Sequence, residues 1–170
     1  MQLLIVRHAD AGDAEEFAKT GSPDSMRPLS SKGRKQIRAA AKALLQLVPD
    51  VSLIATSPYV RAVETHAALR AVYGKEIDTA TTDTLEPERS PDDFAKWIRR
   101  RPEEVIAAVG HEPHLSTLVT WFMTGSDDSR VQLKKGGACL LDFEDHAARN
   151  RATLRWLLTP KQLAALTAER

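Results

Sequence analysis

Short runs of apolar residues alternate along this chain with longer amphipathic segments. Continuous apolar runs of this length are typical of strands buried on both faces of a sheet. Gln2–Val6 and Val105–Val109 are predicted strands of this kind. Further strands are predicted over Leu53–Ala55, Ile77–Thr81, Ala138–Phe143 and Ala152–Leu158. Strands that alternate with helices predict an α/β domain with a mainly parallel sheet. The polar link between the last two strands is short, so we expect an antiparallel hairpin there.

The amphipathic segments have recognisable helix ends. Apolar positions from Ile37 to Val48 recur with a 3.6-residue period, which predicts a helix that begins near Ser30 and stops at Pro49. Ser57-Pro58 and Ser90-Pro91 each resemble an N-cap followed by proline at the first helical position. Two further helices are expected, over Leu115–Phe122 and after Thr159-Pro160, and a polar loop over Asp10–Pro28.

Length and composition narrow the class of protein. The chain has 170 residues, which suits a single domain over residues 1–170. Its formal net charge is +1, which argues against general nucleic-acid or membrane binding. Cys139 is the single cysteine, so neither an internal disulfide nor a cysteine zinc site is expected. With no apolar stretch as long as a membrane span, we expect a cytoplasmic protein that is monomeric by default.

Candidate chemistry gathers at the ends of predicted strands. Arg7 and His8 directly follow the first strand, and His111 directly follows another. In open α/β sheets, ligands bind beyond the carboxyl ends of the strands, so two histidines from distant parts of the chain are expected at one rim. Arg61 falls in the first turn of a predicted helix, where an arginine is unfavourable unless an anion binds.

Four sequence blocks follow one another along the chain. They are Leu3–Ala9 (LLIVRHA), Arg27–Ser30 (RPLS) with Gly33 and Arg34, Thr56–Thr65 (TSPYVRAVET) and Val109–Pro113 (VGHEP). These blocks, in this order, resemble those of the histidine phosphatase superfamily, whose fold is called phosphoglycerate mutase-like. Length, order and the RPL run are most similar to the short bacterial phosphohistidine phosphatases of the SixA type. The resemblance implies a three-layer α/β/α fold with one antiparallel strand.

The resemblance also implies a role for each site residue. His8 would attack phosphorus and form a phosphohistidine intermediate. The phosphoryl oxygens would be held by Arg7, Arg27, Arg61 and His111. No cofactor and no metal ion are expected, because the arginines supply the positive charge. Ala9 departs from the pattern, which has glycine at this position, and a backbone that requires positive φ there would disfavour alanine.

The general acid is left open between two carboxylates, Glu112 and Glu86. An ester substrate requires such an acid, whereas a histidine leaving group carries a nitrogen that can be protonated beforehand. The expected function is therefore a phosphatase that acts on phosphohistidine in proteins or on small phosphate esters. The alternatives are a phosphoglycerate mutase-type phosphotransferase and a non-catalytic module that binds phosphorylated partners.

Overall fold

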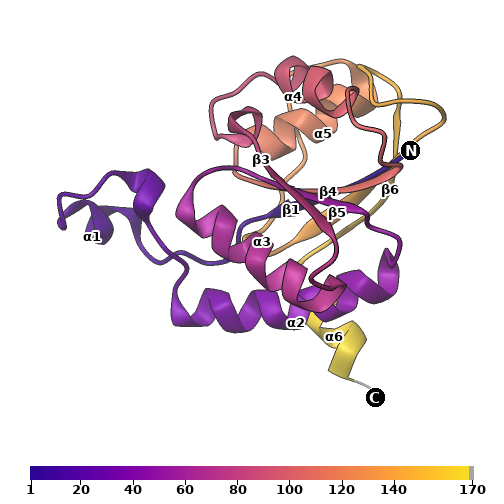
Figure 1. Cartoon of the computed structure of the whole chain (residues 1–170). Helices are drawn as coiled ribbons and strands as arrows, with labels where there is room; N and C mark the ends of the chain where they lie inside the picture. Colours follow the sequence, from indigo (N-terminus) through magenta and orange to yellow (C-terminus); the bar gives the residue numbers. More distant parts are fainter. Residues whose placement is uncertain (169–170) are drawn as a thin grey trace.

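A computed structural model describes residues 1–168 and shows one six-stranded sheet with helices on both faces (Figure 1). The strand order is β3-β2-β4-β1-β5-β6. β5 is antiparallel to both of its neighbours, and the other pairings are parallel, which confirms the predicted fold. The strands are β1 (Gln2–Arg7), β2 (Leu53–Thr56), β3 (Asp78–Thr81), β4 (Val105–Gly110), β5 (Ala138–Phe143) and β6 (Ala152–Leu158).

The two faces of the sheet carry two separate apolar cores, because successive side chains of a strand point to opposite faces. Leu4 and Val6 of β1 pack with the helices of one face, and Leu3 and Ile5 pack with those of the other. The first face holds α2 (Ser31–Leu47), α3 (Val60–Tyr73) and α6 (Pro160–Ala168), and the second holds α4 (Pro91–Ile98) and α5 (His114–Thr124).

Serine caps begin α2 and α4 as the sequence predicts. The Ser30 hydroxyl accepts a hydrogen bond from Gly33 N at 3.0 Å, and the Ser90 hydroxyl accepts one from Asp92 N at 3.2 Å. The prediction for Ser57-Pro58 is wrong, since α3 begins at Val60 and the residue before it makes no side-chain cap. Ser57 instead directs its hydroxyl toward a histidine of the candidate site.

The segment expected to be a polar loop contains two short helical pieces. They are α1 (Ala14–Ala18) and the 3₁₀ turn η1 (Asp24–Met26), and a second 3₁₀ turn, η2 (Asp83–Leu85), precedes α4. The Asp13 side chain caps α1 by accepting a hydrogen bond from Glu16 N at 2.9 Å. This cap is a local sequence signal, and the prediction of a loop did not use it. α1 projects from the body of the molecule (Figure 1). Among residues 1–168, none of the helices is long and apolar enough to cross a membrane.

Candidate active site

Three parallel strands deliver the candidate site to one edge of the sheet. In the register of the sheet Arg7 pairs with Gly110, and Thr56 pairs with Val109. The residues that follow these strand ends stay close to one another, because His8 N donates to Gly110 O at 3.0 Å and Ser57 N donates to Val109 O at 3.0 Å. The parallel ladder therefore brings His8, Ser57 and His111 side by side, although they are far apart in the sequence.

The two histidines face one another across this edge. Their ring centroids lie 5.1 Å apart with an interplanar angle of 52°. His8 is 5% exposed and His111 is 1% exposed. The Tyr59 ring packs against the ring of His111, and the two ring centroids are 4.9 Å apart. The sequence prediction that strand ends would bring His8 and His111 to one rim agrees with this geometry.

His8 is held as a neutral imidazole with one ring nitrogen free. Its Nδ1 lies 2.7 Å from Ala9 O, and because a carbonyl oxygen can only accept, Nδ1 carries the proton. In the neutral ring Nε2 then holds the lone pair. The pKa of His8 is lowered to about 3, mainly by burial and also by the charges of Arg61, Arg7 and Arg27, against the opposing effect of the hydrogen bond to Ala9. His8 is therefore unprotonated at neutral pH.

His111 is oriented by Ser57. Its Nε2 lies 2.8 Å from the Ser57 hydroxyl, which is fully buried and also accepts from Tyr59 N at 3.3 Å. The other ring nitrogen, Nδ1, is buried without a hydrogen-bond partner among the described residues. Burial lowers the pKa of His111 to about 2, with the charges of His8 and Arg61 acting in the same direction.

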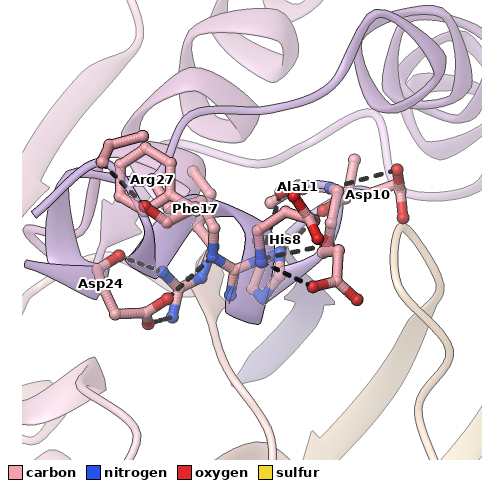
Figure 2. A network of polar contacts seen from close by, with 12 residues as sticks. His8, Asp10, Ala11, Phe17, Asp24 and Arg27 are labelled. Atoms are coloured by element: carbon pink, nitrogen blue, oxygen red, sulfur yellow. Dashed lines mark hydrogen bonds and ion pairs between the residues drawn. The ribbon is translucent and has the colours of Figure 1, made fainter. Parts of the chain in front are cut away.

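Three arginines lie close enough to the histidines to influence their charge. Arg61 and Arg27 are 4% and 9% exposed, and both bind Asp24. Figure 2 shows Asp24 against Arg27 at one end of a polar network that has His8 near its centre. Arg7 Nη1 donates to Leu133 O at 2.7 Å, and its buried Nε has no partner within residues 1–168. The four predicted phosphate-binding residues are thus gathered at one place.

Ala9 does not require the left-handed backbone that would have made alanine a defect. Among residues 1–168, the one residue other than glycine with positive φ is Asn150, which is far from Ala9 in the sequence. Ala9 is fully buried in the core that contains α2 and α3. Its backbone N–H donates to the Thr65 hydroxyl at 3.1 Å, and this hydroxyl donates to Arg61 O at 2.7 Å. Thr65 therefore links the turn after His8 to the helix that carries Arg61.

The two candidate acids line one cavity of about 580 Å³ beside Arg61. Glu86, at the end of η2, forms an ion pair with Arg89 at 3.4 Å. Glu112 Oε1 is buried and has no hydrogen-bond partner in the described part of the chain. Glu112 also faces a second cavity that is lined in part by Arg7. Both carboxylates are therefore near the arginines, and they differ in how strongly they are already paired.

His114 corrects another expectation from the sequence. Its place in the first turn of a helix suggested an exposed side chain, but His114 is 2% exposed because α4 packs against α5 there. Burial lowers its pKa to about 4. Three histidines at this end of the molecule, His8, His111 and His114, are therefore buried in the neutral form.

These buried histidines predict acid lability of the fold. Each has a folded-state pKa below the ordinary 6.5, so the unfolded chain binds more protons below that pH. The free energy of unfolding should then fall as the pH drops from 6.5 toward 4, by up to about 1.4 kcal/mol per histidine at pH 5.5. Urea unfolding at a series of pH values measures this. His114→Gln should reduce the dependence of the unfolding free energy on pH. His146→Ala, at an exposed site, should leave it unchanged. A wild-type unfolding free energy that does not change with pH would contradict the prediction.

Two residues of the site, Ser57 and Asp24, were not identified from the sequence. Ser57 was interpreted as a helix cap because Ser-Pro is a common helix start. Ser57 could have been recognised from its place just after a predicted strand, because His8 and His111 were identified as candidates on that ground. Asp24 lies three residues before Arg27, a spacing that carries no chemical meaning until the backbone forms a 3₁₀ turn.

Comparisons with known proteins agree with this geometry. Residues 3–86 match the Histidine phosphatase superfamily (branch 1). An uncharacterised protein of Picosynechococcus sp. is 31% identical over 170 residues, covering 96% of this chain and 99% of its own. The structure of the protein histidine phosphatase SixA complexed with tungstate superposes with a TM-score of 0.81 at 21% identity, covering 96% of this chain and 99% of that one.

A second solved structure, SixA of Nakamurella multipartitia, has a TM-score of 0.76 at 22% identity and covers 94% of this chain and 95% of its own. These likenesses extend over nearly the whole fold, whereas the family match covers residues 3–86. The sequence blocks, the strand order and the paired histidines at one sheet edge agree with one another. The chain belongs to the histidine phosphatase superfamily, and its fold is that of the SixA proteins.

Proposed function

We propose that this histidine phosphatase hydrolyses phosphohistidine in a protein through a covalent phosphoryl group on His8. The observation that carries the proposal is the state of His8, a neutral imidazole with Nε2 free, close to three arginines and His111. A neutral imidazole nitrogen is the form that can attack phosphorus. The surrounding guanidinium groups oppose protonation of that nitrogen and attract the phosphoryl oxygens.

Each bond in the proposed reaction has an acceptor or a donor. His8 Nε2 forms a bond to phosphorus as the bond between phosphorus and the substrate's nitrogen breaks. The electron pair of that bond stays on the leaving imidazole, which departs neutral if its ring was protonated beforehand. Water then attacks the phosphoryl group on His8, and His8 leaves with the Nε2 lone pair restored. Arg7, Arg27 and Arg61 stabilise the charge on the oxygens in both steps.

His111 acts as a hydrogen-bond donor in this proposal. If the Ser57 hydroxyl donates to His111 Nε2, the neutral ring carries its proton on Nδ1. That nitrogen is buried and unpartnered in the described residues, so a phosphoryl oxygen could accept from it. Ser57 thereby selects the tautomer, and the low pKa of His111 keeps the ring neutral.

A small phosphate ester is the second candidate substrate, and Glu112 is the observation that favours it. An alkoxide leaving group requires a proton donor, and the Glu112 carboxyl lies at the cavity with one oxygen unpaired among residues 1–168. Glu86 is the weaker candidate because Arg89 already pairs with it. A phosphohistidine substrate needs neither acid, so the two substrate classes differ in their dependence on these residues.

The test measures phosphate release from a phosphohistidine peptide and from a panel of small phosphate esters, with chelator present. Wild type, Glu112→Gln and Glu86→Gln are compared on each substrate. We expect rapid release from the peptide, changed less than about fivefold by either substitution, and slow release from the esters, since a positioned general acid is worth about 10²–10⁴-fold only where the leaving group needs it.

The outcomes separate the candidates. Fast ester hydrolysis that falls about 100-fold in Glu112→Gln would establish the ester phosphatase instead. Loss of all activity with chelator would contradict the expectation that no metal is used.

The mutase and the binding module are not favoured. The main reason to consider a binding module was that Ala9 would disrupt the backbone after His8, but Ala9 is not among the residues with positive φ. Cytoplasmic location, the monomeric state, the single domain over residues 1–170 and the lack of nucleic-acid partners stay predictions from the sequence.

A further inference from the structure

Asp24 contacts both of the buried arginines that lie beside the histidines. Its Oδ1 accepts from Arg27 Nε at 2.8 Å, and its Oδ2 lies 2.9 Å from Arg61 Nη2. Its backbone oxygen accepts from Arg61 Nη1 at 2.8 Å. One residue therefore binds two guanidinium groups that come from separate parts of the chain, the η1 turn and the first turn of α3.

The η1 turn explains why Asp24 and Arg27 meet. Residues three apart are eclipsed in a 3₁₀ turn, and Arg27 N donates to Asp24 O at 3.1 Å. Pro28 ends the turn because the residue before a proline favours extended backbone, and Arg27 has φ −66° and ψ 118°. Arg27 Nη1 also donates to Ala11 O at 3.1 Å and to Gly12 O at 3.3 Å. This end of the network is therefore tied to the loop after His8.

Arg61 depends on Asp24 more than Arg27 does. Within residues 1–168 the hydrogen bonds of the Arg61 guanidinium all go to Asp24, and its Cζ lies 5.0 Å from the centroid of the Tyr59 ring. Burial and the charge of Arg27 both act to lower the pKa of Arg61, whereas Asp24 acts to raise it. Two like charges this deeply buried repel one another strongly, and a negative charge between them offsets this repulsion.

Asp24 lines the same cavity as Glu86 and Glu112, but it is unsuited to act as an acid. Burial raises its pKa, yet the hydrogen bond from Arg27 and the charges of Arg61 and Arg27 outweigh burial, so its pKa lies below the ordinary value. An ionised carboxylate has no proton to donate. Its two oxygens serve as acceptors for the two arginines.

The contacts leave donors available for a phosphoryl group. Arginine has five N–H groups. Arg61 Nε is buried without a partner, and Arg27 Nη2 makes no hydrogen bond within the described part of the chain. Holding the two guanidinium groups by their other nitrogens therefore fixes their orientation without using all of their binding capacity.

We propose that Asp24 is a positioning residue, which holds Arg27 and Arg61 side by side so that their free N–H groups bind one phosphoryl group together. The inference rests on the proposed function insofar as these arginines are taken to bind the phosphoryl oxygens. The contrary role follows from the negative charge of Asp24, which would then occupy the anion site and compete with substrate. The two roles predict opposite signs for the same measurement.

The test is calorimetric titration of the whole protein with tungstate, a tetrahedral oxyanion. Asp24→Ala should weaken tungstate binding at least about 10-fold, which corresponds to about 1.4 kcal/mol, because both guanidinium groups lose the acceptor that orients them. Asp24→Asn should fall between wild type and Asp24→Ala, because the amide keeps one acceptor oxygen and loses the charge. Asp142→Asn removes a comparable Asp–Arg pair, with Arg155 on the sheet, and should leave tungstate binding unchanged.

A double-mutant cycle with Arg27→Ala distinguishes positioning from a general effect on the fold. If Asp24 acts through the arginines, Asp24→Ala should have a clearly smaller effect on tungstate binding in the Arg27→Ala background than in wild type. Thermal unfolding of each variant identifies those that do not fold, and Asp24→Asn then decides the outcome. Unchanged or tighter tungstate binding in folded Asp24 variants would overturn the inference. Because tungstate binding needs no turnover, the result is independent of whether phosphohistidine proves to be the substrate.

Discussion

Replacing His8 with alanine should reduce phosphate release by at least about 10⁴-fold, because it removes the atom that forms the bond to phosphorus. His111 is the nearest imidazole, but its Nε2 is committed to Ser57, and its Nδ1 carries the proton in the proposed tautomer. The arginines would still bind the phosphoryl group, so tungstate should still bind to His8→Ala.

Rapid-quench experiments make this prediction specific. Wild type mixed with a ³²P-labelled phosphohistidine peptide should acquire an acid-labile, alkali-stable label on the protein within one turnover, and His8→Ala should acquire none. His66→Ala is the matched control, since His66 is a half-buried histidine of α3 outside the site, and it should keep both label and activity. A folded His8→Ala protein that releases phosphate within tenfold of wild type would show that the nucleophile is another group.

The second large effect is expected at Gly33, on stability. A Cβ added at Gly33 would lie 2.0 Å from Asp10 O and 2.9 Å from Asp10 C. Both atoms belong to backbone that cannot move freely, because Asp10 O accepts from Ser30 N at 2.9 Å and the chain enters the core at Ala9. Gly33→Ala should lower the free energy of unfolding by about 3 kcal/mol or more, at the upper end of what overpacking produces.

The sign of this change is diagnostic. In an isolated helix the same substitution stabilises by about 1 kcal/mol, because alanine is the better helix former. Urea denaturation of wild type, Gly33→Ala and Lys32→Ala measures the difference, and Lys32 is the exposed neighbour in the same turn of α2. Equal or greater stability of Gly33→Ala would mean that the approach of Asp10 to α2 is looser than described. Since Asp10 is two residues from His8, activity should fall together with stability.

Local sequence was sufficient for most of the secondary structure. Strands buried on both faces are continuous apolar runs, and the ends of β5 and β6 agree with the prediction. Ser30 and Ser90 were recognisable because a cap is a contact between residues two or three apart. Gly74 and Gly125 follow α3 and α5, where the sequence placed the ends of the helices. Information of this kind is contained in a short window of the chain.

The residue types of the site were also visible before the structure. Four blocks in the family's order identified His8, Arg7, Arg27, Arg61 and His111 as members of one site, and all five lie together at one edge of the sheet. Their chemical roles follow from the resemblance and remain proposals. The sequence left the choice between Glu112 and Glu86 open. Both carboxylates border the cavity, and the pairing of Glu86 with Arg89 favours Glu112.

Tertiary structure was needed wherever a residue acts through a partner distant in sequence. Ser57 has the local signature of a helix cap, yet β2 and β4 lie side by side and bring its hydroxyl to His111, 54 residues away. From the sequence Asp24 is an ordinary loop carboxylate, and only the packing of α3 brings Arg61 into an ion pair with it. His114 was expected in water, but α4 covers it. Hydrophobic periodicity specifies which face of an element is buried, whereas the polar partner that a side chain meets depends on how the sheet and its helices pack.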